Sequence, residues 1–205
     1  MKAKWKKLDK KGWNQATKIG KAAARLFSRK GYLETTMDQI ANSAKFSKGG
    51  MYYYFPSKTE VLFFILSNYM DLVLENLEQE IEHLENNDDR LKHIISRHIN
   101  LYANNFPEAK VLLHDAHCLP AKYFKIITEK ERKYYRIVTE VLKALSNKPL
   151  PKDQLTTLTF TLFGMCNWIY SWYDPKGSVI PQKLAETIWT IFAKGIYDLI
   201  ARAEN

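Results

Sequence analysis

Hydroxyl and ammonium groups that can contact a polyanion gather in one short stretch of this 205-residue chain. Threonine and tyrosine hydroxyls and lysine ammonium groups donate to phosphate oxygens, and lysine also favours the guanine acceptors of the DNA major groove. A glycine among them lets the backbone approach a partner closely. We therefore expect contacts with double-stranded DNA from Thr36, Lys45, Ser47, Lys48, Gly49, Tyr52, Tyr53, Tyr54 and Lys58.

The residues of this set are expected to contact different parts of the DNA. Phosphates are the expected partners of Thr36, Tyr52, Tyr54 and Lys58, whereas base edges are the expected partners of Lys48, Gly49 and Tyr53. The alternative for the three consecutive tyrosines is core packing. Because consecutive helical residues point in different directions, we expect two of the three to be accessible.

Two short helices joined by a tight turn must position these side chains. Thr36 and Gln39 have the spacing of a capping box, so a helix is predicted to begin there. A second helix is predicted from Ser47 or Lys48, and Ser57 with Glu60 predicts another capped start. A helix pair of this kind over residues 36–55 is typical of a helix-turn-helix reader of DNA.

The same residues resemble a known family. Thr35-Thr36-Met37-Asp38-Gln39-Ile40-Ala41 followed by Ser47-Lys48-Gly49-Gly50-Met51-Tyr52-Tyr53-Tyr54-Phe55 is similar to the signature of TetR-family transcriptional regulators, over roughly residues 13–66. The resemblance implies a three-helix DNA-binding head on an all-helical body that binds a ligand and dimerises. It also supports Thr36, Tyr52 and Lys58 as DNA-backbone contacts. The chain departs from the family in the turn, where Lys45-Phe46 replaces a Gly-Val-like pair.

The charge distribution agrees with a polyanion partner. The formal charge is +9, and residues 1–60 hold 14 Lys and Arg against four acids, whereas the remainder holds 17 against 18. Localised positive charge is the footprint of a nucleic-acid binder. The alternative, a solubilising basic tail, explains the lysines of residues 1–11 but not those of the helix pair. Residues 1–11 are predicted to be a flexible arm, with weak docking of Trp5 and Leu8.

Several other classes find no support in the sequence. Two cysteines predict no disulfide framework, and the absence of a secretion signal or an apolar span predicts a cytoplasmic protein without a membrane partner. No nucleophile elbow, phosphate loop or dinucleotide motif is present, so we expect no enzyme and no cofactor. His114 and His117 could chelate a metal, but without a second pair we expect pocket lining instead and no metal site.

The periodicity predicts an all-α fold of about nine helices, with a DNA-binding domain over residues 11–57 and a ligand-binding and dimerisation domain over 58–205. One helix of about 40 Å is predicted from residue 57 to the break at 86–87. The last two helices, about 153–173 and 181–202, are apolar over more than one face, which predicts a homodimer interface. A wholly intramolecular core is the alternative.

The second domain is expected to hold a mainly apolar ligand site with a few directing polar groups. The residues predicted to line it are Tyr69, Tyr102, Phe106, Leu112, His117, Tyr123, Ile127, Tyr134, Phe163, Asn167 and Trp168. Residues 164–177 with Ile180-Pro181 resemble TetR-type regulators of lipid or aromatic-acid breakdown, several of which respond to acyl-coenzyme A. That resemblance implies an acyl-CoA effector, with Lys125, Arg132, Lys133 and Arg136 available to its phosphates; hydrophobic drug-like compounds are the alternative.

These observations together predict a ligand-responsive repressor that binds a palindromic operator as a dimer and is released by a small hydrophobic effector. The alternative class is a helical ligand-binding or enzymatic protein whose basic N-terminus contacts membranes or acidic partners.

Overall fold

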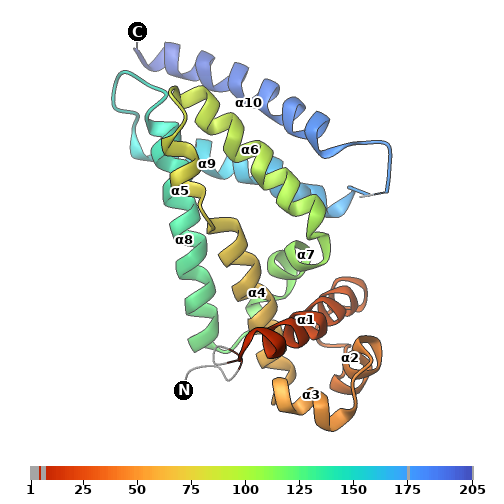
Figure 1. The fold of residues 1–205 in the computed structure, drawn as a ribbon. Helices are drawn as coiled ribbons and strands as arrows, with labels where there is room; N and C mark the ends of the chain where they lie inside the picture. The colour runs from red at the N-terminus through yellow and green to blue at the C-terminus, as the bar shows by residue number, and fades with distance from the viewer. Residues whose placement is uncertain (1–4, 6–7, 175, 205) are drawn as a thin grey trace. The chain divides into compact units, whose positions relative to one another are not determined.

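The computed structural model describes residues 5, 8–174 and 176–204, and this part of the chain contains helices and no strand, as predicted. The α-helices are α1 (Lys10–Lys30), α2 (Met37–Ala44), α3 (Lys48–Tyr54), α4 (Lys58–Leu74), α5 (Leu77–Glu82), α6 (Asn87–Asn104), α7 (Phe106–Asp115), α8 (Ala121–Lys143), α9 (Lys152–Asn167) and α10 (Pro181–Glu204), with 3-10 turns η2 (Ala116–Cys118) and η3 (Trp168–Ser171) (Figure 1). No helix in this part is both long and apolar enough to cross a bilayer.

The chain divides into two compact units. Unit 1 comprises Met1–Leu72 and Pro107–Glu129, and unit 2 comprises Val73–Phe106 and Lys130–Asn205. Each unit has its own buried apolar residues. The domain boundaries expected from the sequence, 11–57 and 58–205, remain a prediction.

In unit 1, α1 packs against both α2 and α3 to form a three-helix head (Figure 1). Asp9 caps α1 by accepting from the backbone N–H of Gly12 at 2.7 Å, so the helix begins at Lys10. The apolar side chains of α1, which include Ile19 and Phe27, are buried. The chain leaves α1 at Gly31, whose φ of 90° and ψ of 153° suit a residue without a Cβ.

Trp5 corrects the expectation of weak docking. Its side chain is only 3% exposed and packs edge-on to Phe64, with ring centroids 5.0 Å apart, and against Trp13 and Phe63. An indole buries a large apolar area, and the aromatic neighbours supplied by α1 and α4 make that burial strong. Residues 9–11 also correct the prediction of a flexible arm, because they cap and begin α1, whereas residues 1–4, 6 and 7 lie outside the described residues.

The single long helix predicted from residue 57 is wrong, because α4 ends at Leu74 and a separate α5 follows. Asn76 between them has a left-handed backbone with a φ of 57°, a conformation that asparagine adopts more readily than most residues. The 17 residues of α4 span about 26 Å rather than about 40 Å. With this break the described residues contain ten α-helices, close to the about nine expected.

In unit 2, α10 lies along α6 and also contacts α9 (Figure 1). The face of α10 that includes Leu184, Ile188 and Ile196 is buried within the unit. The predicted helix 153–173 stops earlier, since α9 gives way to the 3-10 turn η3 at Trp168. A single copy leaves Phe160 and Ile191 exposed, which disagrees with the alternative of a wholly intramolecular core; the homodimer interface stays a prediction.

Candidate nucleic-acid interface

The predicted capping box at the start of α2 is confirmed. The backbone N–H of Gln39 donates to the Thr36 hydroxyl oxygen, and the backbone N–H of Thr36 donates to the Gln39 side-chain oxygen, both at 3.2 Å. The reciprocal bonds satisfy two donors that the first turn would leave unpaired. They fix α2 as the first helix of the pair.

The turn between α2 and α3 is closed by Lys45 in the left-handed conformation, with φ 61° and ψ 46°. The Lys45 N–H donates to the Asn42 carbonyl at 3.1 Å, and the Phe46 N–H donates to the Ala41 carbonyl at 2.9 Å. This is the pattern of a Schellman motif, in which glycine usually holds the left-handed position. The Lys45-Phe46 pair thus makes a tight turn despite departing from the family's residue types.

Helix α3 exposes several of the residues predicted to contact DNA, and the contacts themselves stay a prediction. The Ser47 hydroxyl caps it by accepting from the Gly50 N–H at 3.1 Å, and Met51 faces inward with no exposed area. Tyr52 and Tyr53 are 42% and 57% exposed, which confirms that two of the three tyrosines are accessible. Tyr54 is half-buried.

Several predicted contact residues surround this helix. Tyr54 packs edge-on against the rings of Phe46 and Tyr53. Thr36, Lys45, Ser47, Lys48 and Gly49 are exposed, and a Cβ at Gly49 would meet no atom within 4 Å. The open space at Gly49 lets a partner approach the α3 backbone.

Lys58 forms three hydrogen bonds within this head. Its ammonium donates to the carbonyls of Tyr32, Leu33 and Thr35 at 2.8, 3.0 and 2.8 Å. A lysine ammonium has three hydrogens, so all of them are used in holding the connection between α1 and α2. Contact with a DNA phosphate remains a prediction for this residue, and it requires an exchange of one of these bonds.

The second predicted capping box is only half formed. The Glu60 N–H donates to the Ser57 hydroxyl at 3.2 Å, but the Glu60 carboxylate accepts a short hydrogen bond from the Tyr123 hydroxyl instead of reaching back. Tyr123 also stacks on Phe63, with ring centroids 4.2 Å apart. Burial and the adjacent carboxylate raise the pKa of Tyr123 to about 12. The Glu60 carboxylate therefore pairs with Tyr123, 63 residues away along the chain, and not with the backbone at Ser57.

The predicted ligand-lining residues are divided between the units. In unit 1, Tyr69, Leu112, Tyr123 and Ile127 are buried, whereas His117 is exposed. In unit 2, Tyr102 and Tyr134 are buried, Phe106, Phe163 and Asn167 are half-buried, and Trp168 is exposed. Of these residues, Tyr134, Phe163 and Asn167 lie around one side chain that was not among the predicted lining residues.

That residue is His98 on α6. Its Nδ1 lies 3.0 Å from the Tyr134 hydroxyl, and its Nε2 lies 3.1 Å from the Asn167 side-chain oxygen. Because an amide oxygen only accepts, Nε2 carries the proton and Nδ1 accepts from Tyr134. Burial lowers the pKa of His98 to about 4, against the raising effect of the Asn167 bond. His98 is therefore neutral and ties α6 to α8 and α9.

Tyr102 lies one turn further along α6. Its hydroxyl is buried and has no hydrogen-bond partner among the described residues, and burial raises its pKa. Its ring packs edge-on against Phe106 at 5.6 Å. The spacing of His98 and Tyr102 on an apolar helix face is a sequence signal that could have indicated His98 as part of this cluster.

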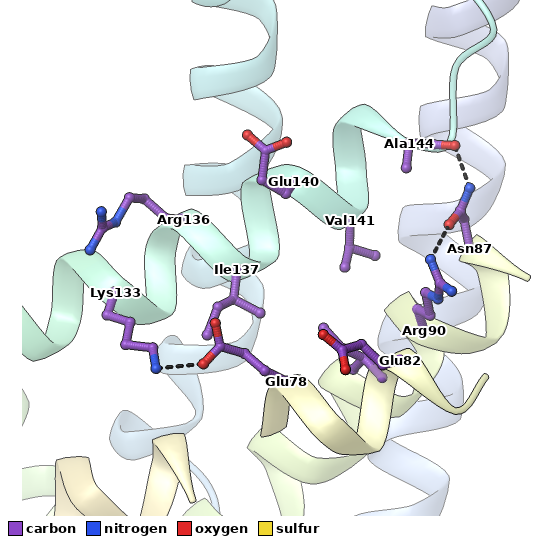
Figure 2. A pocket seen from close by; sticks show the side chains of 11 residues that line it. Glu78, Glu82, Asn87, Arg90, Lys133, Arg136, Ile137, Glu140, Val141 and Ala144 are labelled. Atoms are coloured by element: carbon purple, nitrogen blue, oxygen red, sulfur yellow. Dashed lines mark hydrogen bonds and ion pairs between the residues drawn. The ribbon is translucent and has the colours of Figure 1, made fainter. Parts of the chain in front are cut away.

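A separate open cleft of about 500 Å³ lies in unit 2 along α5, α6 and α8 (Figure 2). Glu78 pairs with Lys133, and Asn87 bridges Arg90 to the Ala144 carbonyl. Three cations and three carboxylates line it, namely Arg90, Lys133, Arg136, Glu78, Glu82 and Glu140. The balance of charge does not favour a strongly anionic ligand.

Both cysteines are free, and the histidine pair is divided between α7, which holds His114, and η2, which holds His117. Cys166 is buried with its pKa raised to about 12 by that burial, in agreement with a core position. Cys118 lies beside exposed His117, with Sγ 3.5 Å from Nε2. The described residues contain no group of three or more His, Cys, Asp or Glu side chains placed to hold a metal ion.

A capped helix pair with an exposed, basic second helix, placed in an otherwise helical chain, defines a helix-turn-helix protein. A model of bacterial regulatory proteins of the tetR family matches residues 19–63, and a model of the tetracyclin repressor-like C-terminal domain matches residues 85–196. The chain belongs to the TetR family of transcriptional regulators.

Individual relatives agree with this assignment. A TetR-family regulator from Bordetella parapertussis 12822 has a TM-score of 0.83 and 32% identity, covering 87% of this chain and 94% of that one. A structure of AibR in complex with isovaleryl coenzyme A and operator DNA has a TM-score of 0.76 and 26% identity, covering 86% and 97%. The regulator HbdR of Aromatoleum sp. (strain CIB) is 42% identical over 74 residues, which are 36% of this chain and about a third (32%) of HbdR.

Proposed function

We propose that the protein is a transcriptional repressor whose head binds a palindromic DNA operator. The exposed face of α3, held by the Ser47 cap and the Lys45 turn, is the observation that carries this proposal. In helix-turn-helix proteins the second helix enters the major groove with its first residues near the base edges. The operator DNA bound by AibR, a relative of similar length, supports the same role here.

The test is selection from a library of random duplexes by the purified protein, followed by gel shift on the enriched sequence. Lys48→Ala and Tyr53→Ala should each weaken binding to that duplex by about 10-fold or more. Lys143→Ala, which removes an exposed lysine from the end of α8 in unit 2, is the matched control and should leave affinity unchanged. Selection that enriches no sequence would contradict operator binding.

We further propose that the repressor is a homodimer formed through α9 and α10. Phe160 and Ile191, on these two helices, are 61% and 59% exposed in the single chain, and Trp168 and Trp172 of the adjoining segment are also exposed. Large apolar side chains gathered on one unit mark an interaction surface. A second copy supplies the same residues, as an isologous two-fold interface requires.

The proposed effector is a small hydrophobic compound, with acyl-CoA as the leading class. The isovaleryl coenzyme A bound by AibR supports that class. Within this chain, the Phe163 ring and the unpartnered Tyr102 hydroxyl of unit 2 offer an apolar surface and a donor for a carbonyl oxygen. The balanced charge of the open cleft in Figure 2 gives no support for a phosphate site there.

Hydrophobic drug-like compounds remain the alternative effector class. Mass spectrometry of ligand extracted from the purified protein distinguishes the two classes. Titration of isovaleryl-, octanoyl- and palmitoyl-CoA should release the selected duplex and raise the melting temperature, because a ligand that binds the folded state stabilises it. Free coenzyme A is the control. Release by a drug-like compound but by none of the thioesters would contradict the acyl-CoA proposal.

A further inference from the structure

An ion pair joins the two helices of the DNA-reading motif. Lys48 Nζ lies 3.2 Å from both carboxylate oxygens of Asp38, and the two side chains are 68% and 62% exposed. Such an exposed pair contributes little to the free energy of folding, because water screens the two charges. The fold therefore does not depend on this ion pair, and both side chains are exposed to a binding partner.

The position of Asp38 is unfavourable for simple phosphate binding. It is the only acid between residues 36 and 58, a stretch that also holds Lys45, Lys48 and Lys58. A carboxylate repels the phosphate backbone, so it lowers the affinity of the head for DNA of any sequence. In the major groove, however, a carboxylate can accept from the amino group at N4 of cytosine.

We infer that Asp38 and Lys48 together read one G·C base pair in each operator half-site. Lys48 donates to O6 and N7 of guanine, and Asp38 accepts from N4 of the paired cytosine. The base pair presents an acceptor edge beside a donor, and the ammonium–carboxylate pair presents the complementary donor beside an acceptor. The 3.2 Å pairing in the free protein holds both side chains close to that arrangement.

The same geometry disfavours a T·A pair at this position. A T·A pair also offers an acceptor, O4, beside the N6 donor of adenine, but it places a methyl group where guanine has N7. The Lys48 ammonium then loses one acceptor, and the Asp38 carboxylate lies next to the N7 acceptor of adenine. Both changes disfavour T·A relative to G·C.

This inference rests on the proposed operator binding, and its test uses duplexes enriched by the wild-type protein. Each position of the enriched half-site is changed in turn, and affinities are measured for the wild type and for Asp38→Asn. Asparagine keeps the shape of the side chain but can also donate, so it pairs well with adenine. Glu34→Gln is the matched control, because it removes an exposed acid of the same head outside the pair.

We expect the wild type to prefer G·C over T·A by about 10-fold at one position of each half-site. Asp38→Asn should reduce that ratio to about threefold or less while leaving the ratios at other positions unchanged. Glu34→Gln should raise affinity for all duplexes alike and keep the 10-fold ratio.

An unchanged ratio in Asp38→Asn would overturn the inference and leave operator binding intact. An equal fall of the affinity ratio at every position would overturn it too, because it would show a general disturbance of the head and not the reading of one base pair. Thermal unfolding of Asp38→Asn beside Glu34→Gln shows whether that disturbance is a loss of fold. Failure of the wild type to enrich any sequence would instead contradict the proposed function itself.

Discussion

Lys45 has a left-handed backbone that most side chains avoid, because the Cβ then approaches the following carbonyl oxygen. Such a conformation costs a non-glycine residue about 1–2 kcal/mol, and the bonds of the Schellman turn hold it in place. The cost suggests that the lysine side chain has a use that glycine lacks. An exposed ammonium at the turn of a DNA-reading motif provides one, since it can neutralise a phosphate.

Replacement of Lys45 by glycine should therefore stabilise the protein and weaken its binding to DNA. We expect a gain of about 0.5–1 kcal/mol in the free energy of unfolding, because relief of the strained conformation exceeds the extra entropy of the unfolded chain. The salt dependence of DNA affinity should fall by about one phosphate contact. Urea unfolding and gel shifts at several salt concentrations measure the two effects.

The control for this substitution is Lys21→Gly, which makes the same chemical change at an exposed site in the middle of α1. There glycine should destabilise by about 1 kcal/mol, because the helix loses a side chain that restricts the unfolded state. Destabilisation by both substitutions would show that the left-handed conformation of Lys45 is not strained.

His98 predicts a pH dependence of stability. Its folded-state pKa, about 4, lies below the ordinary value of 6.5, so the unfolded chain binds a proton first as the pH falls. The stabilisation is complete above about pH 6.5 and is lost as the pH falls through 4, by about 3 kcal/mol in total. Urea unfolding of the wild type and of His98→Gln between pH 7.5 and 4.5 measures it. Parallel curves for the two proteins would contradict a buried, neutral His98.

At the scale of elements, Lys58 binds the connection between α1 and α2 to the start of α4. Its three hydrogen bonds to carbonyls position the N-terminus of α2, and its ammonium also lies 4.5 Å from the centre of the Tyr32 ring. Bonds from a charged donor are stronger than neutral ones, and their loss leaves three carbonyls without this partner. The orientation of the helix-turn-helix therefore depends on a residue outside it.

Substitution of Lys58 by methionine should destabilise the protein by about 2–3 kcal/mol, because the apolar side chain fills similar space but donates no hydrogen bond. Lys30→Met, at the exposed end of α1, is the control and should cost no more than about 0.5 kcal/mol. Chemical denaturation measures both. Similar costs for the two variants would show that the Lys58 bonds contribute little to the head.

The sequence predicted those elements whose signals are local. Thr36 and Gln39 are three residues apart, and Ser47 lies directly before its helix, so the caps of α2 and α3 could be recognised. Trp5, Lys58 and His98 gain their roles from partners more than 20 residues away, which spacing along the chain does not reveal. The α4–α5 break was missed because Asn76 interrupts an apolar pattern that continues on both sides.

For the whole molecule, the homodimer proposed through the exposed apolar residues of α9 and α10 is expected to determine the state in which the protein binds DNA. One head reads one half-site, and two-fold-related heads can read two half-sites about one helical turn, or 34–36 Å, apart. Once one head of a dimer has bound its half-site, the binding of the second head to the other half-site is effectively intramolecular. Dimerisation should therefore raise operator affinity well beyond that of a single head, without any change at α3.

A monomeric variant tests this dependence. Ile191→Glu introduces a charge into the proposed interface and should produce a monomer in sedimentation equilibrium. Gln182→Glu, about two and a half turns away on the opposite side of the same helix, adds the same charge and should remain a dimer. Because Ile191 is exposed in the single chain, its replacement should leave the helical content unchanged.

We expect the monomer to bind the full palindrome about 100-fold more weakly than the wild type, and a single half-site equally well. Insertion of about five base pairs between the half-sites should have a similar effect on the wild type, because it turns one half-site to the opposite face of the duplex. Full operator affinity in a monomeric Ile191→Glu variant would contradict the two-fold arrangement and leave the reading of each half-site to α3 alone.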